Sequence, residues 1–162
     1  MSVIAGAAVA AFGTIAFSLL FGVPRRFYPY CGLNGGASWL VYSRLMESLT
    51  SPPAALGATI VVILLSRTFA VKERCPATIF LIAGIFPLVP GAGVYWTAYY
   101  IVTDELELAA RTGFLACKVA VAIALGIVLA FELPQGFFEF AARKWDTLIA
   151  RVEGGEEDKN TK

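Results

Sequence analysis

The sequence predicts an all-α integral membrane protein, a bundle of five transmembrane helices, with four helices as the alternative. Hydrophobic residues make up 58% of the 162 positions and charged residues only 15%, against about 45–50% and about 25% in soluble domains. The apolar residues form runs of about 20, the length that a helix needs to cross a bilayer. Short charged clusters separate these runs, and a soluble domain could not bury so much apolar surface.

Four runs predict spans at about 3–22, 53–71, 76–102 and 113–133. A further segment, 30–48, is ambiguous because on hydropathy alone it could lie along the membrane interface, which would leave four spans. Its polar residues are Asn34, Ser38, Ser43, Arg44 and Glu47.

Loop charge favours five spans, because Lys and Arg accumulate on the cytoplasmic side of a membrane. Five spans put ten basic residues on one side and two, Arg44 and Arg111, on the other, whereas four spans give eight against four. We therefore expect a multi-pass protein of the cell membrane with its N-terminus outside and its C-terminus in the cytoplasm. The ten residues are Arg25, Arg26, Arg67, Lys72, Arg74, Arg143, Lys144, Arg151, Lys159 and Lys162.

Small residues recur every fourth position in the predicted spans, which lets helix backbones approach closely in lipid. Gly32 and Gly36 form such a pair in the second span. The first span has a longer row: Gly6, Ala10, Thr14, Ser18 and Gly22.

Beyond the transmembrane domain predicted over residues 1–135, apolar residues recur at helical spacing over 136–153, with charged residues on the other side. This pattern predicts an amphipathic helix that lies in the cytoplasmic interface or, equally, one that binds a partner without lipid contact. The last segment, 154–162, is polar and is expected to be disordered.

The composition argues against an enzyme and predicts no cofactor or metal. Histidine is absent, which removes the commonest general base and metal ligand. Cys31, Cys75 and Cys117 are widely spaced and fit neither a disulfide framework nor a metal motif, so we expect them to pack as small apolar residues. The net charge of +1 gives no basic field for nucleic acid.

The fourth predicted span contains an interruption from Pro87 to Gly91, close to its midpoint. Pro87 and Pro90 each remove a backbone donor, and unpaired backbone groups at membrane depth must face protein or a hydrated cavity. Broken helices of this kind occur at the substrate sites of transporters. A kink used only for packing is the alternative. Gly93 and Tyr95 follow the break and are candidate pathway residues.

Lys118 is the clearest charged residue inside a predicted span, five residues past Gly113 and thus about 8 Å along the helix. Its ammonium group could face inward and neutralise a substrate carboxylate, or it could extend back to the nearby outer surface. The sequence is compatible with both positions of the ammonium group.

Asn34, Ser38 and Tyr42 form a polar row at i, i+4 spacing in the second span. Such a row suits a substrate pathway, or hydrogen bonds that hold helices together.

Several motifs resemble the threonine/serine exporter family, over about residues 3–135. The passage from Ala11 to Arg26, with its ending Phe21-Gly22-Val23-Pro24-Arg25-Arg26, is similar to the opening of the C-terminal-type membrane domain of that family. The segment Gly35-Gly36-Ala37-Ser38-Trp39-Leu40-Val41-Tyr42 resembles the next helix. The segments Arg74-Cys75-Pro76-Ala77-Thr78 and Ile85-Phe86-Pro87-Leu88-Val89-Pro90-Gly91 resemble its most specific part.

The resemblance implies a small stand-alone subunit that requires a homologous larger membrane subunit as its partner. It also implies proton-driven export of small polar metabolites such as threonine, serine or a dicarboxylate, with Pro87, Pro90 and Gly91 as family-like residues and Arg25 and Arg26 as a basic boundary. The alternative function is a non-transporting structural subunit of another membrane complex.

Overall fold

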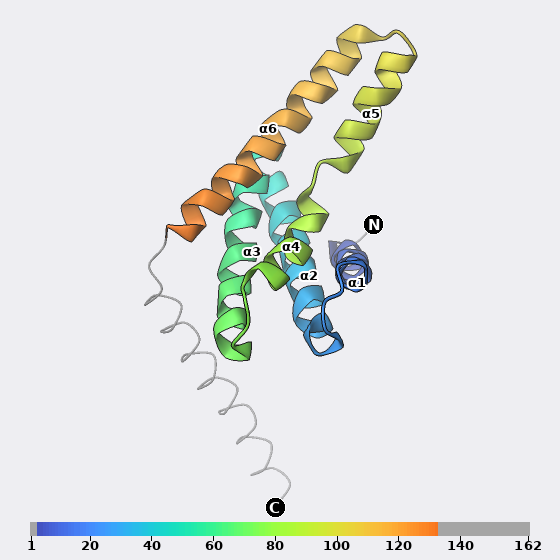
Figure 1. The fold of residues 1–162 in the computed structure, drawn as a ribbon. Helices are drawn as coiled ribbons and strands as arrows, with labels where there is room; N and C mark the ends of the chain where they lie inside the picture. Colours follow the sequence, from blue (N-terminus) through green and yellow to red (C-terminus); the bar gives the residue numbers. More distant parts are fainter. Residues whose placement is uncertain (1–2, 133–162) are drawn as a thin grey trace, which may run out of the picture.

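A computed structural model describes residues 3–132, and this part of the chain is entirely helical (Figure 1). The predicted interfacial helix (136–153) and tail (154–162) lie outside the described residues. The elements in chain order are α1 (Val3–Leu20), η1 (Arg25–Phe27), α2 (Tyr28–Met46), α3 (Ser51–Glu73), α4 (Thr78–Ile85), η2 (Phe86–Leu88), α5 (Gly91–Val102) and α6 (Leu106–Phe131).

Three of these helices are long and apolar enough to cross a membrane: α1, α3 and the Leu106–Leu129 part of α6. A fourth span results if the bent pair Thr78–Leu88 and Gly91–Val102 is taken as one. The 19-residue helix α2 is not among these candidates. The predicted bundle of five spans therefore stays a prediction, and three to four spans are supported.

Helices α1 and α2 pack closely because glycines on each helix make room for side chains of the other. A Cβ added at Gly32 would lie 2.9 Å from Ile15 Cδ1, and one added at Gly35 would lie 2.6 Å from Thr14 Cβ. Near the other end of α1, Gly6 contacts the Trp39 ring. A side chain larger than hydrogen at these positions would force the neighbouring helix to shift, as expected where glycines let helices pack closely in lipid.

Helix α2 lies between α1 and α3 and runs antiparallel to both. The Tyr30 hydroxyl near its start donates a hydrogen bond to Glu73 Oε1 at the end of α3 (2.8 Å). Near its other end, Tyr42 Oη and Ser51 Oγ, at the start of α3, are 2.9 Å apart and hydrogen-bonded. Helix α2 therefore extends through the same depth as the candidate span α3.

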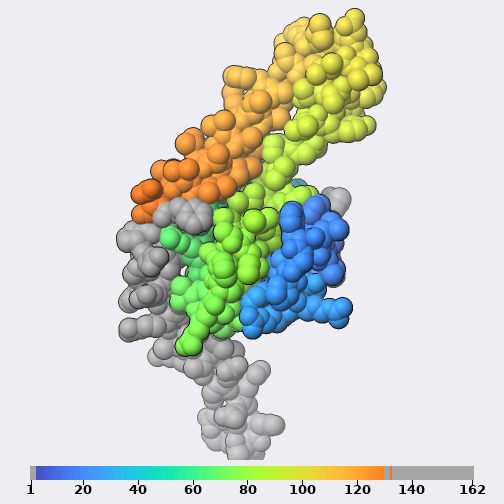
Figure 2. All heavy atoms as spheres, viewed as in Figure 1, coloured from blue at the N-terminus to red at the C-terminus, as the bar shows by residue number. Residues whose placement is uncertain are grey.

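The α5–α6 hairpin projects away from the body formed by α1 to α4 (Figures 1 and 2). The C-terminal half of α6 packs on α3, where Val119 and Ile123 join a core with Ala58 and Val62. Helix α5 packs mainly on α6 and has no buried residue. The projecting part of the hairpin exposes apolar surface along its length, including a 63% exposed Tyr95.

Helix α6 begins at Leu106, seven residues before the span predicted from Gly113. The added turns contain an exposed i,i+4 pair, in which Arg111 Nη2 donates to Glu107 Oε1 at 2.7 Å, and such a pair favours helix. Lys118 lies five residues, or about 8 Å, past Gly113 as predicted, but twelve residues, or about 18 Å, from the start of its helix.

Candidate functional site

The interruption between α4 and α5 falls within the predicted Pro87–Gly91 segment. Helix α4 gives way to the 3-10 turn η2, which contains Pro87, and α5 begins at Gly91 with a bend of 48° between the two parts. Pro90 is the N-cap of α5 at φ −76° and ψ 52°, and no side chain caps this helix end.

The first turn of α5 leaves backbone donors free. The Gly91 N–H donates to the Val89 carbonyl at 2.7 Å, and the Val94 N–H donates to the Pro90 carbonyl at 3.0 Å. In residues 3–132 the N–H groups of Ala92 and Gly93 donate no hydrogen bond. These groups form the positive end of the helix dipole, which favours an anionic group.

The two sides of the break differ in burial. Before it, the Leu88 side chain is only 4% exposed and belongs to the core between α3 and α6. After it, a Cβ added at Gly91 would meet nothing within 4 Å. The helix thus leaves the packed body at the break, so its first turn lies at the edge of open space.

Asn34 lies inside the body, against Gly84 three residues before Pro87, and joins three helices. From α2, its Nδ2 donates to Ser66 Oγ on α3 (2.8 Å) and to the Phe80 carbonyl on α4 (3.0 Å). The Asn34 side chain is fully buried and packs against Gly84. Its Oδ1 has no partner in the described part of the chain. In this conformation Asn34 forms hydrogen bonds between helices, which is one of the two roles predicted for it.

Ser38 is also fully buried, and its hydroxyl donates to the Gly35 carbonyl on its own helix at 2.7 Å. It forms no hydrogen bond to another helix within residues 3–132. A role of Asn34 or Ser38 in a substrate pathway stays a prediction.

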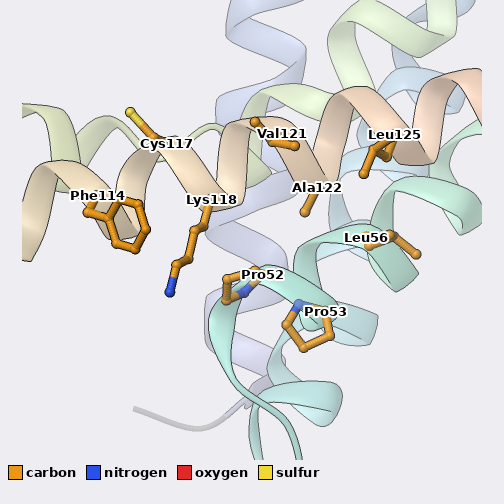
Figure 3. Close-up of a pocket in the computed structure, with 9 residues that line it drawn as sticks. All are labelled: Pro52, Pro53, Leu56, Phe114, Cys117, Lys118, Val121, Ala122 and Leu125. Carbon is orange, nitrogen blue, oxygen red and sulfur yellow. The ribbon is translucent and has the colours of Figure 1, made fainter.

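Tyr95 and Lys118 are near the break but not part of it: Tyr95 lies one turn past Gly91, and Lys118 lies two residues past Ala116, which contacts Gly93. Lys118 lines a groove between α6 and the first turn of α3 that contains no residue of the Pro87–Gly91 segment (Figure 3). Tyr95 is exposed on α5, with its ring against Trp96 at 5.5 Å between centroids, and Gly93 packs toward Ala116 of α6. Of the eight predicted residues, four lie at the break or in the turn after it: Pro87, Pro90, Gly91 and Gly93.

Sequence reasoning missed the polar residues of α3. Thr59 and Ser66 are fully buried and donate to the carbonyls four residues earlier, at 2.8 and 2.7 Å. They are seven residues apart and share a face with the buried Ala55 and Val62. The seven-residue spacing indicates that Thr59 and Ser66 lie on the same buried face of the helix. By contrast, nothing in the sequence indicates that the Phe80 carbonyl accepts a hydrogen bond from a side chain.

Outside the membrane-spanning segments, the turn between α3 and α4 contains Cys75. Burial raises the pKa of its thiol, and the negative charge of Glu73 raises it further against the opposing effect of Arg26. Cys75 is therefore a thiol at neutral pH and a poor nucleophile. No group of three His, Cys, Asp or Glu residues within 3–132 is placed to hold a metal ion.

Comparison with known families identifies the chain. Residues 6–132 match the family model described as Threonine/Serine exporter, ThrE. The chain belongs to the threonine/serine exporter family. This match confirms the predicted family, whose members are exporter-type transporters. The break between α4 and α5 lies within the matched residues. No curated protein and no solved structure matches this exporter-family chain.

Proposed function

We propose that this member of the threonine/serine exporter family is one subunit of a proton-driven secondary transporter that exports small polar metabolites. The solutes that fit are threonine, serine or a dicarboxylate, since each presents a carboxylate. The observation that carries the proposal is the uncapped start of α5, where the N–H groups of Ala92 and Gly93 lack acceptors beside the open side of Gly91. Half-helix N-termini of this kind bind carboxylates in transporters.

A homologous larger membrane subunit completes the site. The support is the exposure of α5, which has no buried residue and stands clear of the α1–α4 body (Figure 1). A free N–H at membrane depth is costly against lipid, because it has no water or carbonyl to bond. A second subunit that covers the break would leave these groups facing a hydrated, solute-sized gap instead.

The chain spans the bilayer five times in this proposal, with its N-terminus outside. The support is the position of α2, which pairs antiparallel with both neighbouring spans over its whole length. An odd number of spans lets two homologous domains insert in opposite orientations, as in inverted repeats.

The proton-carrying acid is expected on the partner. Within residues 3–132 no carboxylate is buried: Glu47, Glu73 and Glu132 lie at or beyond helix ends, and Asp104, Glu105 and Glu107 form an exposed acidic loop and first turn. A proton-coupled mechanism needs a titratable group along the path, and the described part of this chain does not supply one there.

The test is transport by vesicles that contain this chain with its partner, this chain alone, or the pair with Pro90→Ala and Gly91→Leu in this chain. We expect threonine or dicarboxylate efflux from the pair only, and its loss in the double variant while the two subunits still co-purify. Gly13→Ala, on an exposed glycine with nothing within 4 Å, is the matched control. Active transport by this chain alone would disprove the proposal that transport requires the partner subunit. Unchanged transport in the double variant would favour the alternative, a non-transporting structural subunit.

A further inference from the structure

A groove of about 180 Å³ lies between the end of α1 and the first turns of α4. Thr78 is the only polar residue among the six described residues that line it. Phe21 on one wall and Ile82 on the other are 61% and 54% exposed, so the groove opens on the surface of two candidate membrane spans. The residues that line it are Phe21, Val23, Thr78, Ile79, Ile82 and Ala83.

Two arginines lie at one end of this groove. Arg25 and Arg26 follow Val23 within three residues, in the turn after α1. The Arg26 Cζ is 4.4 Å from the centroid of the Phe27 ring. Phe27 in turn packs in one cluster with Val23 and Ile79, which both line the groove. A single aromatic ring therefore separates the Arg26 guanidinium group from the groove.

No carboxylate of the described chain neutralises these two arginines. Both are exposed, and within residues 3–132 the only ion pair is Arg111–Glu107. Lys72 and Arg74, which are also exposed, add two positive charges at the same end of the body (Figure 1). Four cations thus lie near the groove with one carboxylate, Glu73, which already accepts a hydrogen bond. This end of the groove can attract an anion.

The charged end of the groove lies at a membrane surface. Two candidate spans end there, α1 at Leu20 and α3 at Glu73. The 2.8 Å bond from Tyr30 to Glu73 joins the turn after α1 to the end of α3. From this level α4 leads from Thr78 to Ala83, about 8 Å along the helix, into the bent pair that forms a further candidate span. The cations therefore lie at headgroup level, and the apolar groove beside them lies at acyl-chain level.

We propose that this groove is a binding site for an anionic phospholipid, with the headgroup phosphate at Arg25 and Arg26 and one acyl chain along the apolar walls. The occupant must carry a negative charge that is followed directly by an apolar chain. Inorganic phosphate has only the charge, and a zwitterionic lipid gains less from the four cations. Guanidinium groups bind phosphate oxygens through paired hydrogen bonds, and basic pockets between membrane helices bind anionic headgroups. The site contains no residue of the break between α4 and α5, so it does not depend on the proposed transport.

The experiment measures lipid bound to the full-length chain by native mass spectrometry, with phosphatidylglycerol or phosphatidylcholine added to the detergent-purified protein. We expect a preference for phosphatidylglycerol. Arg25→Gln and Arg26→Gln should each lower phosphatidylglycerol binding about fivefold, from the worth of one basic residue near anionic lipid. Arg44→Gln is the matched control, because Arg44 is an exposed arginine at the opposite end of α2, and it should leave this binding unchanged.

A second variant, Ile82→Trp, fills the groove without changing charge and should also release phosphatidylglycerol. Ile4→Trp makes the same change at an exposed position of α1 outside the groove and should not. Circular dichroism confirms that each variant is folded. Equal phosphatidylglycerol binding by wild type and the two arginine variants would overturn the proposal. Unchanged binding in Ile82→Trp would also overturn it, since surface charge alone would then hold the lipid and no acyl chain would occupy the groove.

Discussion

Replacement of Gly35 by alanine tests whether the α1–α2 pair holds the body together by backbone proximity. An added Cβ would lie 2.6 Å from Thr14 Cβ and 3.0 Å from Thr14 Cγ2, whereas unstrained contacts are about 3.5–4.0 Å. The helices must therefore separate by roughly 1 Å, and overpacking of this kind costs about 1–3 kcal/mol. Alanine recovers up to about 1 kcal/mol of helix propensity, so we expect a net loss of about 1–2 kcal/mol.

The matched control is Gly13→Ala, the same chemical change on α1, where nothing lies within 4 Å. It should be neutral or stabilising by up to about 1 kcal/mol. Thermal unfolding of the purified chain in detergent, followed by tryptophan fluorescence, measures both variants. Their difference removes the shared propensity gain and isolates the steric cost at Gly35.

An exchange variant separates steric overlap from other causes. The double variant Thr14→Gly/Gly35→Ala moves the bulk from α1 to α2. Its loss of unfolding free energy should therefore be smaller than the sum of the losses in the two single variants, by at least about 1 kcal/mol. If Gly35→Ala unfolds at the same temperature as wild type, or if the two losses simply add, the close contact described here does not hold the helices together.

Three further outcomes follow from the structure. Gly93→Val should lower transport without lowering the stability of the α1–α4 body, because an added Cβ lies 3.1 Å from Ala116 Cβ and would push α5 off α6; equal loss of body stability would argue against this. Tyr30→Phe should lower the unfolding free energy by about 1–2 kcal/mol through loss of its 2.8 Å bond to Glu73, and an unchanged melting temperature would contradict it. A reporter fused to the N-terminus should be active outside the cell, and cytoplasmic activity would reject five spans.

Hydropathy predicted helix bounds well where the helix has the same ends as the apolar run. Helix α1 begins at Val3 as predicted and ends at Leu20, two residues before the predicted end, where Gly22 adopts φ +67°. At α6 the predicted start, Gly113, was seven residues late, because the helix begins at Leu106 and includes the charged Glu107–Arg111 pair. Hydropathy predicts where lipid contacts the chain, and helix ends depend also on local polar pairs.

The candidate site was predictable only in part. Proline chemistry is local, so the break at Pro87–Gly91 could be inferred from the sequence. Whether Asn34 faces a pathway or other helices depends on α3 and α4, which supply Ser66 and the Phe80 carbonyl. The exposure of α5 could not be inferred either, because its apolar sequence suits lipid, a neighbouring helix and a partner protein equally.

The sheltered position of α2 has a consequence for biogenesis. Its polar side chains make it a poor candidate to leave the translocon alone, yet Asn34 and Ser38 are fully enclosed once α1, α3 and α4 surround it. We expect the ribosome-bound chain to keep α1 and α2 together until α3 has emerged. A nascent chain truncated before Ser51 would then fail to integrate its second hydrophobic segment stably.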